Sequence, residues 1–239
     1  METYSDIFSS VYDRFGWNYY PDSFADLLLA WIAQEGLKVR KALDIGCGTG
    51  VLAARLAQKG IESAGMDLSE GMIRVARQHY PHLRFETGDM VTYRSEEQFD
   101  LVTATCDALN HITDPEDLRR VFQNVFAYTA SGGVFLFDLL REEEARTCPP
   151  VDLGQIDADQ VIYQILREGD RVTLQIDICS EGRQVHTERI HERLYEPEMI
   201  IRLLREAGFD RVRCTDRLLA GQTEHAATWF VIAQKPCGQ

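Results

Sequence analysis

Apolar positions along the chain alternate between two spacings, which predicts an alternation of helices and strands. Residues 4–36 carry apolar side chains three and four positions apart, typical of an amphipathic helix, and Gly36 is placed to end it. From residue 39 onward, short apolar runs typical of buried strands are separated by segments with helical spacing. The expected strands are 39–44, 63–67, 83–86, 99–105 and 134–138, and the expected helices are 51–59, 71–79 and a segment capped by Asp114. Strands joined by helical connections pair in parallel, so a doubly wound α/β sheet is predicted.

Residues 155–195 break this rhythm. Three strand-like runs, at 160–166, Arg171–Ser180 and 184–195, are separated by short turns that contain glycine, which predicts an antiparallel meander. A helix over Pro197–Ala207 and strands near Arg211–Thr215 and Thr228–Gln234 then complete the α/β pattern. We expect a single domain over residues 1–239, with an N-terminal helical cap at 1–36 and an inserted antiparallel lid at 155–195.

Composition narrows the class of protein. Of 239 residues 45% are hydrophobic, which excludes wholesale disorder. The net charge of −13 disfavours nucleic-acid and anionic-lipid partners, since both are bound through clustered Lys and Arg. Six dispersed cysteines without a C-x-x-C pair indicate reduced thiols and no metal site. Without a targeting segment or a run of ~20 apolar residues, the sequence predicts a cytoplasmic protein that does not enter a membrane, and a homodimer is left open.

A glycine-rich loop follows the first predicted strand. The sequence Leu-Asp-Ile-Gly-Cys-Gly-Thr-Gly ends at Gly50, and glycines let a ligand approach the backbone. Asp67 ends the next strand 17 residues later, near the ~20-residue offset at which an acid binds ribose hydroxyls. Val51 stands where a dinucleotide fingerprint needs a small residue, and no Gly-Lys-Ser/Thr follows as in a P-loop. The loop therefore predicts a nucleoside-containing ligand other than a dinucleotide.

Three ordered motifs carry a family resemblance: residues 44–50, Asp67 with the following residues 68–72, and residues 88–90. They resemble the successive motifs of class I S-adenosylmethionine (SAM)-dependent methyltransferases. The resemblance implies SAM as cofactor and a Rossmann-like, mostly parallel seven-stranded sheet with an antiparallel last strand. It implies that Asp44 orients the loop and the amino acid part of SAM, that Asp67 binds the ribose, and that Asp89 contacts the adenine amino group. The expected cofactor-binding residues are Tyr12, Asp44, Gly46, Cys47, Gly48, Gly50, Asp67, Leu68, Asp89, Met90 and Thr105.

A looser similarity involves both ends of the chain. Tyr4, Phe8, residues 12–13 and residues 192–195 resemble a subgroup of small bacterial methyltransferases, in which N-terminal helices close over the cofactor and an antiparallel insertion covers the acceptor pocket. This similarity implies that Tyr12 is a lid contact and that the meander is a wall of the substrate site.

The segment after the fourth predicted strand is expected to face the transferring methyl, because open α/β sheets bind ligands beyond the carboxyl ends of their strands. The candidate catalytic residues are Asp107 for positioning or deprotonation, Asn110 for orientation and His111 as a base. On the last meander strand His186 and His191 have opposite parity, and His191 with Arg193 are the expected substrate contacts. Trp17, Tyr19 and Tyr20 either line the acceptor pocket or pack the N-terminal helices, and Cys47 and Cys106 are expected to be small packing residues.

The function that these observations favour is SAM-dependent transfer of a methyl group to a small-molecule acceptor by in-line displacement. One alternative is a methyltransferase that acts on tRNA, rRNA or protein. An NAD-dependent oxidoreductase is disfavoured by Val51. A further alternative is a non-catalytic SAM- or nucleoside-binding protein, whose acceptor pocket would be filled by residues such as Tyr12 or Trp17.

Overall fold

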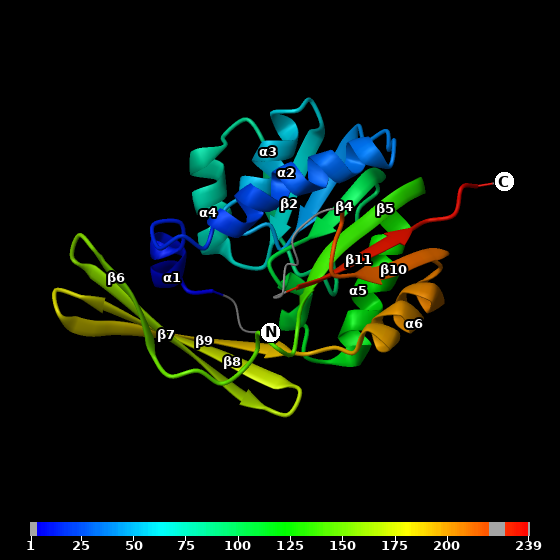
Figure 1. The fold of residues 1–239 in the computed structure, drawn as a ribbon. Helices are drawn as coiled ribbons and strands as arrows, with labels where there is room; N and C mark the ends of the chain where they lie inside the picture. The colour runs from blue at the N-terminus through cyan, green and yellow to red at the C-terminus, as the bar shows by residue number, and fades with distance from the viewer. Residues whose placement is uncertain (1–3, 220–227, 239) are drawn as a thin grey trace.

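The larger of two sheets has seven strands. The computed structural model describes residues 4–219 and 228–238, and its strand order is β10-β11-β5-β4-β1-β2-β3 (Figure 1). β1 to β5 are parallel, whereas β11 runs antiparallel to both of its neighbours, β5 and β10. The bounds are β1 Lys41–Ile45, β2 Glu62–Asp67, β3 Arg84–Thr87, β4 Phe99–Ala104, β5 Thr129–Leu140, β10 Arg211–Thr215 and β11 Thr228–Gln234. The predicted Rossmann-like sheet with an antiparallel last strand is confirmed.

Helices cover both faces of this sheet. Successive residues of a strand point to opposite faces, and on β5 Phe135 packs against Phe122 of α5 while Leu136 belongs to the core beneath α2. One face carries α2 (Tyr19–Gln34) and α3 (Val51–Ala57), with α4 (Glu70–His79) beside α3, and the other carries α5 (Pro115–Tyr128) and α6 (Pro197–Ala207) (Figure 1). Asp114 caps α5 as predicted, because its carboxylate accepts a hydrogen bond from the Glu116 N–H. No described helix is long and apolar enough to cross a membrane.

A second, antiparallel sheet has four strands, one more than predicted. Its strands are β6 (Val151–Ile156), β7 (Asp159–Glu168), β8 (Arg171–Ser180) and β9 (Arg183–Arg193), paired in chain order. The sequence pattern missed β6 because all of its residues are exposed, so no apolar alternation marks it, and Gly154 interrupts the run. The antiparallel segment therefore begins at residue 151 rather than near 155.

The N-terminal segment joins the two sheets. The helix predicted over residues 4–36 is two helices, α1 (Asp6–Val11) and α2, with turns between them in which Gly16 has a φ of +87°. Phe8 and Val11 of α1 pack in one cluster with Met72 of α4 and with the apolar face of the four-stranded sheet. Figure 1 shows α1 wedged between that sheet and α4, which fixes the smaller sheet against the larger one.

Candidate functional site

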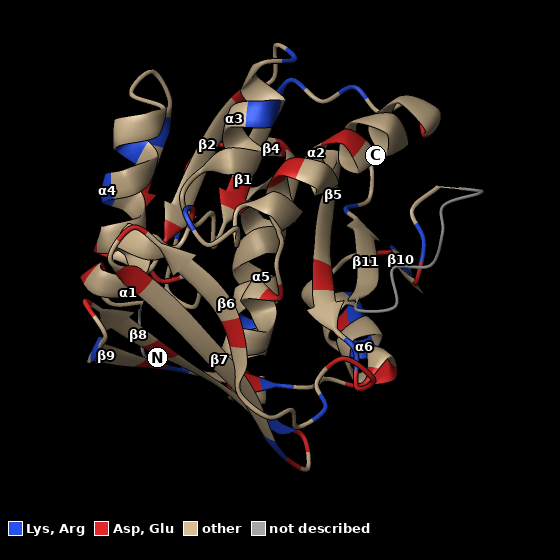
Figure 2. Cartoon of the chain, turned by 60° about the vertical axis from the view of Figure 1, so that its left-hand side comes forward, with Lys and Arg blue, Asp and Glu red and all other residues tan. Residues whose placement is uncertain are grey.

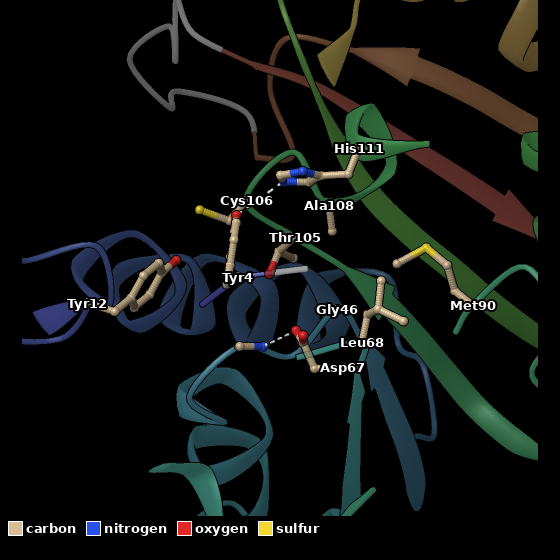
Figure 3. A pocket seen from close by; sticks show the side chains of 11 residues that line it. Tyr4, Tyr12, Gly46, Asp67, Leu68, Met90, Thr105, Cys106, Ala108 and His111 are labelled. Atoms are coloured by element: carbon tan, nitrogen blue, oxygen red, sulfur yellow. Dashed lines mark hydrogen bonds between the residues drawn. The ribbon is translucent and has the colours of Figure 1, made fainter. Parts of the chain in front are cut away.

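A cavity of about 590 Å³ lies at the carboxyl ends of β1, β2 and β4. A smaller hollow of about 300 Å³ shares its walls and extends to Asp44, Cys47 and Thr49. Figure 3 shows side chains of the β4 turn and of the N-terminal segment converging on the larger cavity beside the glycine loop. It is lined by Tyr4, Tyr12, Gly46, Gly48, Asp67, Leu68, Met90, Thr105, Cys106, Ala108 and His111. Because the cavity stays open beside Tyr12, the filled pocket expected of a non-catalytic scaffold is not seen.

The three glycines of the loop have different roles. Gly46, Gly48 and Gly50 have φ values of +71°, +52° and +83°, a region that favours glycine. A Cβ on Gly48 would meet no atom within 4 Å, so its backbone opens into the cavity, where a ligand can approach it. A Cβ on Gly50 would lie 2.6 Å from the ring of Phe85. Gly50 therefore lets the loop pack closely on β3, and it is absent from the described residues that line either hollow.

Asp67 connects the loop to the end of β2. Its Oδ2 accepts a 2.9 Å hydrogen bond from the Gly48 N–H and its Oδ1 a 2.8 Å bond from the Ser69 N–H (Figure 3). Burial raises the pKa of this carboxyl, while the two N–H donors favour its charged form. The fixed carboxylate faces the cavity, and its contact with a ribose stays a prediction.

Asp44 lies at the end of β1, 3% exposed, and faces the smaller hollow. Its Oδ1 accepts a 2.7 Å hydrogen bond from the Thr103 hydroxyl on β4. Burial raises the pKa of Asp44 to about 7. A positively charged amino group in the hollow would favour the ionised form, which fits the cofactor's amino acid part.

Asp89 and Met90 shape the turn after β3. The Asp89 carboxylate accepts a 2.9 Å hydrogen bond from the Val91 N–H, and this turn presents Met90 to the cavity. Asp89 is not among the described residues that line the cavity, so its contact with an adenine amino group stays a prediction.

The turn after β4 holds two residues in a strained conformation. Cys106 and Asp107 have φ values of 61° and 51°, which L-residues rarely adopt. Their N–H groups donate hydrogen bonds of 3.0 and 2.7 Å to the carboxylate of Asp138 on β5, which is 1% exposed. The Tyr20 hydroxyl donates a 2.6 Å bond to the same carboxylate. Sequence reasoning missed Asp138, although an acid ending the apolar run Val-Phe-Leu-Phe was a usable signal.

Asp107, His111 and Glu192 meet beyond this turn, with one ligand atom of each within 4.8 Å of the others. The Nε2 of His111 lies 3.2 Å from the Tyr4 hydroxyl, a contact drawn in Figure 3, and 3.8 Å from a Glu192 oxygen. Burial lowers the pKa of His111 to about 4, so the imidazole is neutral. Burial and the charge of Asp138 raise the pKa of Asp107 to about 7, and burial raises that of Glu192 well above its usual range. Glu192, on β9, is a site residue to which sequence reasoning gave no role.

Asn110, predicted to orient the reacting groups, is hydrogen-bonded within the protein at both ends of its amide. Its amide nitrogen donates a 2.7 Å hydrogen bond to the Arg193 carbonyl, and its amide oxygen accepts a 3.1 Å bond from the Leu140 N–H. The side chain is 0% exposed and does not line the cavity among the described residues. Asn110 therefore fastens the β4 turn to β5 and β9, and it acts on the site only through their position.

The predicted substrate contacts His191 and Arg193 lie on the outer face of the four-stranded sheet. Strand β9 pairs His191 with Thr173 and Glu192 with Val172, so Glu192 shares the apolar inner face. His191 is exposed and contacts the Thr173 hydroxyl at 3.1 Å. The expected difference in parity between His186 and His191 is correct, but the inward residues are His186 and Glu192.

The other aromatic and cysteine candidates differ in their surroundings. Trp17 stacks on Tyr12 at 5.8 Å between ring centroids, Tyr19 is 75% exposed, and Tyr20 binds Asp138. Helix packing is therefore the better interpretation of Trp17. Burial raises the pKa of both the Cys47 and the Cys106 thiols, which fits small packing residues rather than nucleophiles.

Comparison with known proteins gives one family. Residues 42–133 match the family model described as a methyltransferase domain. The Bacillus subtilis protein YqeM, which is named as a methyltransferase, is 29% identical over 219 residues, or 87% of each chain. The ubiquinone biosynthesis O-methyltransferase of Pseudomonas aeruginosa is 36% identical over 130 residues, which are 50% of this chain and 53% of that enzyme.

Solved structures share the whole fold. An S-adenosylmethionine-dependent methyltransferase from Clostridium acetobutylicum superposes with a TM-score of 0.80 at 23% identity, over 97% of this chain and 98% of that one. CalS10, an amino pentose methyltransferase from Micromonospora echinaspora with SAM bound, gives a TM-score of 0.74 at 20% identity, over 98% and 99% of the two chains. Together with the acids around the glycine loop, these matches agree with a class I SAM-dependent methyltransferase whose cofactor is SAM.

Proposed function

We propose that this enzyme methylates a small molecule by in-line displacement at the cofactor's sulfonium. The observation that carries the proposal is that one cavity of about 590 Å³ contains both the glycine loop and the His111 end of the site. The cofactor and the reacting part of the acceptor must meet in this one hollow, and small ligands bind in concave sites of this kind. Tyr4 and Tyr12 form walls of the cavity, and such a confined space favours a small acceptor over a folded macromolecule.

The charges around the site also favour a small molecule over RNA. No Lys or Arg is among the described residues that line either hollow, whereas Asp44 and Asp67 are. RNA binding relies on basic side chains along the phosphate backbone. In Figure 2 the Lys and Arg positions are scattered along the cartoon among those of Asp and Glu. The similar ubiquinone biosynthesis and amino pentose methyltransferases act on small molecules by name, which supports the same acceptor class here.

Different residues align the cofactor and the acceptor. Bound SAM supplies a methyl group on a positively charged sulfur. Asp67 and the Gly48 backbone are placed to hold the nucleoside, and Asp44 to hold the amino group. Asp138 accepts hydrogen bonds from the N–H groups of Cys106 and Asp107. These bonds keep the turn that faces the acceptor in a fixed position relative to the glycine loop. Tyr4 and Tyr12 cover the cavity from the N-terminal segment and exclude water from the reacting atoms.

The proposal is tested by incubating the full chain with methyl-labelled SAM and three separate fractions of a bacterial extract: the small-molecule ultrafiltrate, total RNA and total protein. We expect label in the ultrafiltrate. Label in the RNA or protein fraction alone would contradict the proposal, as would SAM binding by calorimetry without transfer to any fraction.

A further inference from the structure

We propose that the acceptor is a cationic amine, whose ammonium group is recognised by the carboxylates of Asp107 and Glu192 and gives one proton to Glu192 before it attacks the methyl. This inference rests on the proposed small-molecule methyl transfer and names its acceptor class. It comes from two acids, half-buried Asp107 and buried Glu192, whose carboxylates lie close to His111, which lines the cavity.

The first observation is the isolation of Glu192. Its side chain is 6% exposed, and no hydrogen bond from a described residue reaches its carboxylate. The nearest basic atom is the Nε2 of His111 at 3.8 Å, and that imidazole is neutral. So buried a carboxyl group has little contact with water, and buried polar groups in native proteins have a partner. The missing partner is therefore expected to be a donor that arrives with the substrate.

The second observation is that the carboxylate of Asp107 also lacks a hydrogen-bond donor. The Asp107 N–H donates to Asp138, but its carboxylate accepts no hydrogen bond from the described residues. Its oxygen, a Glu192 oxygen and a His111 nitrogen all lie within 4.8 Å of one another. Charge-assisted N–H···O bonds of about 2.8 Å from a tetrahedral ammonium reach acceptors about 4.6 Å apart. One ammonium group therefore fits between the two carboxylates.

The charges distinguish an amine from a hydroxyl acceptor. A hydroxyl attacks well after losing its proton, and two neighbouring carboxylates raise its pKa and oppose the resulting anion. An amine attacks as a neutral group and becomes positive, so charge moves from the sulfur toward Asp107 and Glu192. Carboxylates placed where positive charge develops stabilise the transition state. The pair therefore favours nitrogen over oxygen as the acceptor atom.

The protons in this reaction are all accounted for by groups of the site and by solvent. The acceptor arrives as R–NH3⁺ and transfers one proton to Glu192, which burial makes a better base than an exposed glutamate. The neutral nitrogen forms a bond to the methyl carbon, the carbon–sulfur bond breaks, and its electron pair stays on sulfur. The products are S-adenosylhomocysteine and a methylated ammonium that Asp107 holds, and the Glu192 proton passes to solvent when they leave. Among the described residues, the titratable groups that lie near Glu192 are Tyr4, Cys106, Asp107 and His111.

A divalent metal is the competing occupant of the same three side chains. The Tyr4 hydroxyl already lies 3.2 Å from the Nε2 of His111, so that nitrogen shares its hydrogen or its lone pair with Tyr4. A metal ligand needs a bare lone pair. The geometry therefore favours the amine, and the metal becomes an outcome of the test.

The first experiment acts on the acceptor. The ultrafiltrate that accepts labelled methyl is treated with the N-hydroxysuccinimide ester of acetic acid, which acetylates amines, and is then assayed again with the full chain and SAM. We expect transfer to be lost after acetylation and unchanged by EDTA. Persistent transfer after acetylation would identify a hydroxyl or carbon acceptor and overturn the inference while the proposed function stands. Loss with EDTA and recovery with Mg²⁺ would identify a metal and also overturn it. Label only in RNA or protein would contradict the proposed function itself.

The second experiment acts on Glu192. With the amine recovered above, Glu192→Gln is expected to lower kcat/KM by about 100-fold near pH 7, because an amide cannot accept the proton. The loss should shrink as the pH rises and the free amine accumulates, while calorimetry shows unchanged SAM affinity. Glu168→Gln, which alters an exposed acid on β7, is the matched control and should behave as wild type. Asp107→Asn should raise KM. A fall in kcat/KM of Glu192→Gln that is the same at every pH would contradict the role of Glu192, as would an unchanged kcat/KM in this variant.

Discussion

The Asp138 carboxylate on β5 accepts a 2.7 Å hydrogen bond from the N–H of Asp107, and it thereby holds a residue with a φ of 51° at the acceptor end of the cavity. A left-handed residue costs about 1–2 kcal/mol, and the turn contains two of them in succession. The carboxylate that binds both N–H groups is 1% exposed, so water cannot replace it. The geometry of the reacting centre therefore depends on an acid that does not line the cavity.

Asp138→Asn is expected to reduce catalysis more than cofactor binding. The amide loses one acceptor oxygen for the Cys106 and Asp107 N–H groups, so the turn shifts, and misplacement of about 1 Å costs roughly 100-fold in rate. We expect a fall in kcat at near-normal SAM affinity, measured by steady-state kinetics and calorimetry. Tyr20→Phe removes one hydrogen bond from the same carboxylate and should cost only about 1 kcal/mol of stability. Equal kcat in Asp138→Asn and wild type would show that the turn does not need Asp138.

Asp67→Ala should weaken SAM binding by about 1–3 kcal/mol, because buried hydrogen bonds to the ribose are lost. Isothermal titration measures the change directly, with Glu70→Gln, an exposed acid three residues along the chain, as control. Unchanged affinity in a folded Asp67→Ala variant would remove Asp67 from the cofactor site.

Three glycine variants separate backbone strain from contact with the cofactor. Alanine at Gly36, Gly48 or Gly50 meets a positive φ in every case, at a cost of about 1–2 kcal/mol. Only Gly50→Ala adds a clash, with Phe85, so its melting temperature should fall furthest. Only Gly48→Ala projects into the cavity, and we expect a tenfold or greater loss of SAM affinity, about 1.4 kcal/mol or more. Gly36→Ala should share the strain and keep the affinity. Equal SAM affinity in Gly36→Ala and Gly48→Ala would refute the contact.

Asp44 makes the stability of the free protein depend on pH. Its folded pKa of about 7 lies above the value of an unfolded aspartate, so the folded state retains this proton more strongly. The stability it contributes is fully present below pH 4 and is lost as the pH rises through about 7, by at most about 4 kcal/mol. Asp44→Asn cannot titrate, so its unfolding free energy relative to wild type should increase from pH 5 to pH 8. A constant difference in denaturant titrations across this range would exclude the shift.

The contact between Ser5 and Glu188 is expected to hold the N-terminal segment closed. The Ser5 hydroxyl donates a 2.5 Å hydrogen bond to Glu188 on β9 and also accepts one from the Phe8 N–H, which caps α1. Ser5→Ala removes both, a cost of about 0.5–2 kcal/mol for the cap alone. Hydrogen exchange in α1 and SAM dissociation should both become faster. Ser10→Ala, whose hydroxyl bonds only the Ile7 carbonyl, should change neither.

The part of the fold that follows local rules was predictable. The glycine loop, the alternation of strands and helices, and the Asp114 cap all depend on residues close together in sequence, and all were confirmed. Strand β6 was missed because a wholly exposed strand leaves no apolar pattern. The inner face of β9 was also misjudged, since alternation fixes which residues share a face but not which face turns inward.

The candidate site also combines features that local sequence predicts with features that only tertiary structure shows. Asp67 and Gly48 belong to one motif, and the sequence placed them together. Glu192 lies 3.8 Å from His111 although it belongs to a different sheet, and Asp138 acts through the backbone of residues 31 and 32 positions away, so only tertiary structure reveals either role. Asn110 looked catalytic because of its position after β4, yet both ends of its amide are used inside the protein.

The position of Tyr4 has a practical consequence for producing this enzyme. Tyr4 lines the cavity and contacts His111, so a tag fused close ahead of it would lie near the cavity. At the other end of the chain, Gly238 bonds Ser131 near the start of β5, at the edge of the sheet opposite the cavity. Recombinant protein for activity screens should therefore carry its tag after the C-terminal strand, because an N-terminal tag would make an active enzyme look inert.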